Sequence, residues 1–183
     1  NGLHGFSNDP DVNNFPPQKQ NLTVYVVDFK SMKVWEKELD DPSSGLTQGQ
    51  IDSLSVTSPQ FYQCGKTLYV TGGYGIETAT GNMSTKPLLS AIDVPGVIDW
   101  VTGSGKKESF SKNLRQIADP LVQVTGGVMY QLTPHHPMLL IFGQNFTGLY
   151  TDGSNGNYTN QVRSFYIIDN GKDLYLAEYK HQP

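Results

Sequence analysis

Short runs of strand-forming residues alternate with turn residues along most of this chain. Residues 61–64 and 67–72 are separated by a Gly-Lys turn, and residues 87–93 and 97–101 by a Val-Pro-Gly turn. Strands favour aromatic and β-branched residues, whereas glycine and proline favour turns. The pattern predicts two hairpins, joined by a polar loop over 74–86, that form one four-stranded antiparallel sheet.

The same succession of strands recurs later in the chain. Residues 54–64 align with 122–132 at an offset of 68, 67–73 with 138–144 at 71, and 88–93 with 164–169 at 76. The pattern of 88–93 also occurs at 23–28, and second short strands follow at 32–39, 96–101 and 173–179. Strand lengths are kept while connections change length, so we interpret the segments as repeated structural units.

We divide the chain into a half unit over 1–41, a full unit over 42–105 and a second full unit over 106–183. Apolar residues at 110, 114 and 117 have helical spacing, so we expect a short helix over 108–118 in the connection into the last unit. A single four-stranded sheet cannot bury both of its faces, so the units must stack on one another. The predicted fold class is all-β.

The composition agrees with an all-β fold and narrows the possible partners. The 183 residues include 19 glycines, 11 prolines and 10 tyrosines, and only 16% are charged. The net charge is −4 and the basic residues are scattered, so we expect no nucleic-acid partner. No apolar run is long enough to span a membrane, and the single cysteine, Cys64, cannot form an intrachain disulfide.

Glycosylation sequons bear on the location of the protein. Four Asn-x-Ser/Thr sequons begin at Asn21, Asn82, Asn145 and Asn157. They favour a secreted or cell-envelope location, although such sequons also arise by chance in a chain rich in asparagine and threonine.

The repeat resembles the Kelch family of β-propellers. In the complete unit, Gly72-Gly73 end one strand, Asp93 ends the next, and Trp100 follows seven residues later; Asp28 and Trp35 keep this spacing near the start. The last unit departs from the pattern, with Gly143-Gln144 for the glycine pair and Leu176 for the tryptophan. The resemblance implies four-stranded propeller blades that serve as a platform for proteins or carbohydrates.

The chain supplies about two and a half such blades, whereas propellers close with about four to eight. We therefore expect the chain to be part of a larger propeller, whose remaining blades come from an upstream segment or a second chain. A compact β-sandwich is the alternative.

The long loops of a propeller crowd around its channel, so we expect a ligand at the loops over 74–86 and 144–161. Their aromatic, amide and carboxylate groups can stack on sugar rings and hydrogen-bond to hydroxyls. The candidate ligand-binding residues are Tyr74, Asn145, Tyr150, Asp152, Asn157, Tyr158 and Arg163. A solvated hairpin loop is the alternative, because Asp-Gly-Ser-Asn-Gly is ordinary turn sequence.

We expect no cofactor and no metal site. His135-His136, with Tyr62 and Cys64, invite comparison with galactose-oxidase-type propellers, which bind copper. Nothing similar to the metal motif of that family surrounds the histidines, and adjacent side chains on an extended chain point apart. We expect Cys64 to be a packed, apolar-like residue of an inner strand.

Catalytic motifs such as a nucleophile elbow, a phosphate-binding loop or a zinc-protease helix are lacking. The sequence therefore predicts a non-catalytic propeller module that binds a protein or carbohydrate ligand through its long loops. The alternative is part of an enzyme that acts on sugars, with its active site over the central channel.

Two structural expectations complete this interpretation. Asp28, Asp93 and Asp169 recur at strand ends, and we expect each to cap the following turn by accepting backbone N–H groups. The residues expected to be largely buried in the middle unit are Phe61, Tyr62, Leu68, Val70, Leu89, Ile92, Val97 and Trp100.

Overall fold

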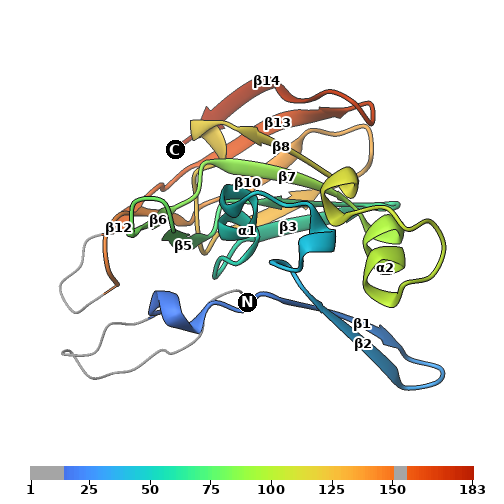
Figure 1. Ribbon diagram of the computed structural model, residues 1–183. Coiled ribbons are helices and arrows are strands. Elements are labelled where there is room, and N and C mark those ends of the chain that lie inside the picture. Colours follow the sequence, from blue (N-terminus) through green and yellow to red (C-terminus); the bar gives the residue numbers. More distant parts are fainter. Residues whose placement is uncertain (1–14, 151–155) are drawn as a thin grey trace.

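The computed structural model describes residues 15–150 and 156–183, and these form antiparallel sheets connected by short helices (Figure 1). The strands lie in two four-stranded and three two-stranded sheets. The predicted all-β class is therefore confirmed. The assignment of the sheets to Kelch-type blades stays a prediction.

The two four-stranded sheets share one strand order. The first sheet runs β3 (Gln60–Cys64), β4 (Thr67–Thr71), β7 (Leu88–Asp93) and β8 (Leu114–Ala118). The second runs β9 (Val128–Gln131), β10 (Met138–Ile141), β13 (Val162–Asp169) and β14 (Leu174–Gln182). The four strands predicted for the last unit are thus confirmed.

A small hairpin is inserted at the same place in both sheets, between the second and third strands. In the first sheet it consists of β5 (Tyr74–Glu77) and β6 (Asn82–Thr85). In the second it consists of β11 (Gln144–Phe146) and β12 (Gly156–Tyr158). The long polar loops of the sequence therefore contain short strand pairs.

The backbone corrects the alignment of the two units by one residue. Gly72 and Gly73 both have positive φ, of 64° and 84°, and the next such pair is Phe142 and Gly143, at 54° and 87°. Gly72 therefore corresponds to Phe142, at an offset of 70 rather than the 71 inferred from the sequence. Glycine is needed at 73 because a Cβ there would lie 2.4 Å from Cγ2 of Val56.

The strand predicted over 96–101 is wrong, because this segment is the helix α2 (Val94–Thr102). Asp93 is its N-cap and accepts a hydrogen bond from the N–H of Gly96, and Gly103 ends it in a left-handed conformation. Val97, Trp100 and Val101 are the buried residues of the helix. Their i, i+3, i+4 spacing is a helical signal that the strand interpretation overlooked.

The helix predicted over 108–118 is also wrong. The segment contains a 3-10 turn, η3 (Phe110–Asn113), and then strand β8. β8 pairs with β7 from Leu88–Ala118 to Ile92–Leu114, so it completes the first sheet in place of the segment that forms α2. The pairing gives hydrogen-bond partners to the backbone groups of β7 and of residues 114–118. This gain outweighs the weak tendency of residues 114–118 to form a helix.

The predicted hairpin at the start is confirmed as β1 (Thr23–Asp28) and β2 (Lys33–Glu38). The shorter elements are η1 (Pro17–Lys19), η2 (Pro42–Ser44), α1 (Gln48–Leu54) and η4 (Pro120–Val122). A capping box between Thr47 and Gln50 begins α1.

The core lies on both faces of the first sheet. One face packs on the second sheet, with Leu89 and Ala91 of β7 against Leu140 of β10 and Phe165 of β13. The other face packs on α1, α2 and the β1–β2 hairpin, which contributes Val24, Val26 and Trp35. Figure 1 shows the hairpin and the second sheet on opposite sides of the first sheet.

Half of the eight expected core positions are buried, and three more are partly buried. Leu89, Ile92, Val97 and Trp100 are buried, and Tyr62, Leu68 and Val70 are partly buried. Phe61 is 66% exposed, so that prediction is wrong. It lies on β3, the edge strand of the sheet, where its face receives little cover. Cys64, at the end of the same strand, is exposed as well, which corrects the expectation that it is packed.

Candidate functional site

A polar cavity of about 340 Å³ lies beside the β11–β12 hairpin and brings together four of the predicted ligand-binding residues. Asn145 and Asn157 are directly opposite each other in the hairpin, Tyr158 follows on β12, and Arg163 comes from β13. The segment after β8 closes another side with Leu121 and Gln123. The cavity volume falls in the range of small-molecule sites, about 300–1,000 Å³.

Arg163 is the charged group of this cavity and is only 4% exposed. Its Nη1 donates a hydrogen bond to the backbone oxygen of Leu121, at 2.9 Å. No Asp or Glu belongs to the described residues that line the cavity. Burial lowers the pKa of the Arg163 guanidinium, and the nearby Tyr179 opposes this shift. A guanidinium stays protonated in proteins, so the cavity carries a positive charge.

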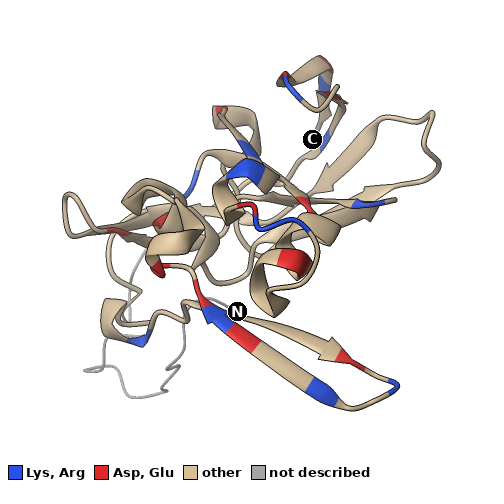
Figure 2. Ribbon diagram, turned by 45° about the vertical axis from the view of Figure 1, so that its right-hand side comes forward, with Lys and Arg blue, Asp and Glu red and all other residues tan. Residues whose placement is uncertain are grey.

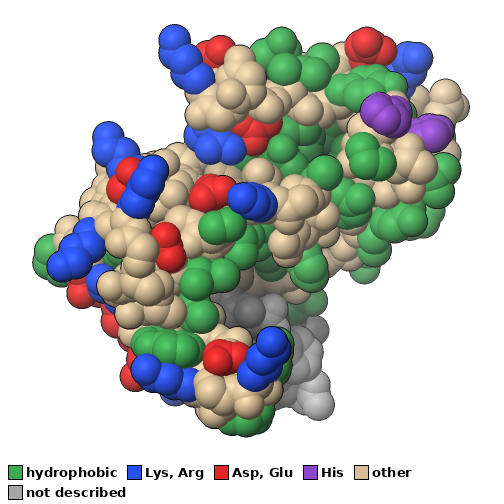
Figure 3. Space-filling model, turned by 90° about the vertical axis from the view of Figure 1, so that its right-hand side faces the viewer, with side chains coloured by type: hydrophobic (Ala, Val, Ile, Leu, Met, Phe, Trp, Pro, Cys, Tyr) green, Lys and Arg blue, Asp and Glu red, His purple; other side chains and the backbone are tan. Residues whose placement is uncertain are grey.

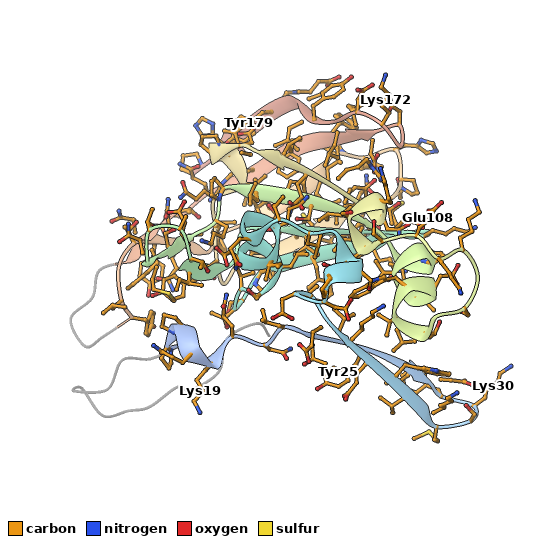
Figure 4. The ribbon with its side chains drawn as sticks, in the orientation of Figure 1. Lys19, Tyr25, Lys30, Glu108, Lys172 and Tyr179 are labelled. Carbon is orange, nitrogen blue, oxygen red and sulfur yellow. The ribbon has the colours of Figure 1, made fainter. Side chains whose placement is uncertain are left out.

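Tyr179 reaches the cavity because β14 contains a β-bulge. The pairing of β13 with β14 shifts between Ser164 and Tyr166, and Glu178 has a φ of 52°. An extra residue reverses the alternation of side chains beyond it. Leu176 and Tyr179 therefore lie on the same inner face of the sheet. Figure 4 shows Tyr179 toward the end of the molecule that carries β12, away from Lys30 and Glu108.

Two other predicted site residues pack among aromatic rings. Tyr74 is 2% exposed, and its hydroxyl donates to the backbone oxygen of Gly148 at 2.6 Å. Burial raises its pKa to about 12. Tyr74 meets Phe146 edge-to-face at 5.5 Å, and Tyr150 lies 5.0 Å from the same ring. We therefore leave Tyr74 and Tyr150 out of the cavity site, and Asp152 lies outside the described residues.

Several cavity residues were not among the sequence candidates. Leu121 lies in the turn η4 and Gln123 follows it, and the Gln123 side chain donates to the backbone oxygen of Thr85 at 2.9 Å. Gln161 and Tyr179 also line the cavity. No linear signal marks Leu121, because its contribution is a backbone carbonyl brought to Arg163 from 42 positions away.

The three recurrent aspartates accept backbone N–H groups as predicted, although Asp93 caps the helix α2 rather than a turn between strands. Asp28 accepts from the N–H of Lys30, Asp93 from Gly96 and Asp169 from Gly171.

Asp169 has a second role that the sequence did not reveal. It accepts hydrogen bonds from Nε and Nη2 of Arg115, at 2.9 and 2.7 Å. Burial tends to raise the pKa of Asp169, but hydrogen bonds from Arg115 and Gly171 outweigh it and the pKa is lowered. This ion pair joins β8 of the first sheet to β13 of the second.

Among the described residues, the histidine turn is not grouped with other potential metal ligands. His136 is exposed and its Nδ1 lies 2.7 Å from the hydroxyl of Thr133. Within residues 15–150 and 156–183, no three His, Cys, Asp or Glu side chains are grouped as metal ligands. Figure 2 shows basic and acidic residues interspersed along the ribbon.

Exposed apolar side chains occur on the two outer surfaces of the stacked sheets. Val128 and Tyr175 are exposed on the second sheet, and Tyr25 and Val27 on the β1–β2 hairpin. Tyr130 is also exposed but packs edge-to-face against Tyr62 of β3 in the first sheet. Figure 3 shows hydrophobic side chains at the surface around the histidines. Both ends of the stack therefore present apolar surface. Neither α-helix in the described part of the chain is long and apolar enough to cross a membrane.

Comparisons with known proteins add no family to this picture. No protein-family model, curated protein or solved structure matches the chain. The function must therefore be argued from the cavity and from the exposed surfaces.

Proposed function

We propose that this protein is a binding module that holds a carbohydrate in the cavity beside the β11–β12 hairpin. The observation that carries the proposal is the convergence of Asn145, Asn157, Tyr158 and Arg163 on one concave, polar surface. Amide groups can donate to and accept from sugar hydroxyls, and a tyrosine face can stack on a sugar ring. Tyr158 is exposed enough to offer its ring in this way.

Binding is favoured over turnover by the chemistry of the lining. Glycosidases generally use a pair of carboxylates, one as acid and one as base or nucleophile. The described lining contributes amides, hydroxyls and one guanidinium, which suit recognition better than glycosidic bond cleavage. The cavity is also concave and small, which suits a sugar better than a protein surface.

A glycan panel tests this proposal. The 183-residue chain, expressed in bacteria so that the sequons stay unmodified, is screened against immobilised glycans, and hits are measured by calorimetry. Substituting Asn157→Ala or Tyr158→Ala should weaken the hits at least tenfold without lowering the thermal midpoint. Tyr25→Ala, an exposed aromatic on the distant hairpin, is the matched control. Release of free sugar during binding would instead favour the enzyme alternative.

We also propose that further sheets of the same kind cover the two apolar ends of the stack, as expected of a segment of a larger propeller. The proposal is supported by the exposed Val128 and Tyr175 at one end and Tyr25 and Val27 at the other. In the described chain, β1 also pairs only with β2, so its second edge can accept another strand.

Native mass spectrometry of the protein isolated from its source tests the second proposal. A non-identical polypeptide bound to the chain supports it, and Val128→Asp should release that polypeptide by placing a charge in the contact. An isolated, monomeric chain that remains soluble would favour the β-sandwich alternative.

A further inference from the structure

The chain has two arginines, and the structure treats them differently. Arg115 forms a two-pronged pair with the carboxylate of Asp169, which is the geometry that a guanidinium favours. Arg163 is more deeply buried, yet the one salt bridge among the described residues belongs to Arg115. Among the described residues, the fold therefore pairs one arginine with a carboxylate and holds the other, more deeply buried, in a cavity wall that includes none.

A buried charge without an opposite charge is destabilising, because water that would solvate it has been removed. The backbone oxygen of Leu121 accepts from one nitrogen of Arg163, while a guanidinium has five N–H donors. Arg163 lines the cavity beside Asn145 and Asn157, whose side-chain amides also carry donors. This wall of the cavity is therefore rich in hydrogen-bond donors and positively charged.

We propose that the Arg163 cavity recognises the negatively charged oxygens of an acidic sugar, with a carboxylate as the group that Arg163 holds. The inference rests on the proposed carbohydrate-binding function and specifies its ligand. The planar guanidinium matches a carboxylate with two parallel hydrogen bonds. The amides of the hairpin then hold ring hydroxyls, and the bulge in β14 brings Tyr179 to the same wall.

The competing explanation is that Arg163 only ties β13 to the carbonyl of Leu121. Glutamine at 163 can still donate one hydrogen bond but carries no charge, so Arg163→Gln separates the two roles. A purely structural arginine predicts that the folded protein binds its ligand as before, because glutamine can keep the hydrogen bond to Leu121. An anion-binding arginine predicts a midpoint that stays or rises, since an uncompensated buried charge is removed.

The test measures binding of glucuronate, glucose, glucose 6-sulfate and inorganic phosphate by ligand-observed NMR and calorimetry. Glucuronate should bind about 10- to 100-fold more tightly than glucose, as expected for charge-assisted hydrogen bonds. Arg163→Gln should remove this preference. Lys180→Gln is the matched control, because it also deletes one positive charge and lies on the neighbouring strand β14. The Lys180 side chain alternates with Tyr179 and therefore faces away from the cavity.

The outcomes distinguish failure of the anion inference from failure of the carbohydrate function. Glucose binding as tightly as glucuronate overturns the anion inference and leaves the carbohydrate function standing. Saturable phosphate binding that depends on Arg163, with no sugar bound, supports an anion site and overturns the carbohydrate function. Tighter binding of glucose 6-sulfate than of glucuronate overturns the choice of a carboxylate and identifies a sulfate ester as the group that Arg163 holds. No binding of any probe overturns both. An equal loss in the Lys180→Gln control overturns the role given to Arg163 and leaves the carbohydrate function standing.

Discussion

Trp100 is the side chain on which the packing of α2 depends most. It is 4% exposed and meets the ring of Phe110 edge-to-face at 5.3 Å. Its indole N–H donates to the hydroxyl of Ser43 at 3.2 Å, and Nζ of Lys37 lies 4.8 Å above the ring. The residue therefore joins α2 to η3, η2 and the β1–β2 hairpin.

Trp100→Ala should lower the free energy of unfolding by ~3–5 kcal/mol, since the indole is buried and the remaining cavity cannot close completely. That is a large part of the ~5–15 kcal/mol that stabilises an ordinary domain. Trp100→Phe keeps a ring against Phe110 but loses the hydrogen bond to Ser43, and should cost ~1–2 kcal/mol. Urea unfolding followed by far-ultraviolet circular dichroism gives both values.

Trp35 supplies the control, because the same substitution removes a tryptophan that is only partly buried. Trp35→Ala should cost ~1–2 kcal/mol, in proportion to the smaller apolar area lost. A loss below about 1 kcal/mol for Trp100→Ala, with an unchanged dependence on urea, would refute the packing described for α2.

Gly73→Ala should lower the free energy of unfolding in urea by ~2–4 kcal/mol, because the new Cβ would clash with Val56 and the alanine would keep a strained positive φ. Gly126→Ala should cost only ~1 kcal/mol, because residue 126 has a φ of 72° but nothing lies within 4 Å of the added Cβ. Equal losses would contradict the close approach at Gly73. Asp169→Asn should cost ~1–3 kcal/mol at pH 7, because Arg115 loses its carboxylate. Since folding lowers the pKa of Asp169, its stabilisation is complete above the unfolded value near 3.9 and is lost as the pH falls below it. The difference between wild type and variant should therefore shrink below about pH 4, and a difference that persists there would refute the ion pair's role.

The local pattern was sufficient where strand and turn signals agreed. The hairpin of β1 and β2 and the strands of the second sheet follow short apolar runs bounded by glycine, asparagine or proline, and they lie where the sequence predicted them. The aspartate caps were also predictable, because a short carboxylate can reach backbone N–H groups only a few residues away.

The identity of two neighbouring segments was decided by tertiary structure. Residues 94–102 and 114–118 are both short and apolar, and such runs suit either a helix or a strand. Their assignment depended on which segment could pair with β7 and which could cover the first sheet. Both segments carried a helical spacing of apolar residues, and the predictions exchanged the two.

The candidate site divides in the same way. The sequence by itself determined that Asn145, Asn157, Tyr158 and Arg163 occur in or near one variable loop. Only the tertiary structure buried Arg163, brought the carbonyl of Leu121 to it from 42 positions away, and separated it from any carboxylate in the described lining. Burial and charge compensation depend on which distant segments are packed together. A linear pattern records residue types and their spacing, but it does not record those neighbours.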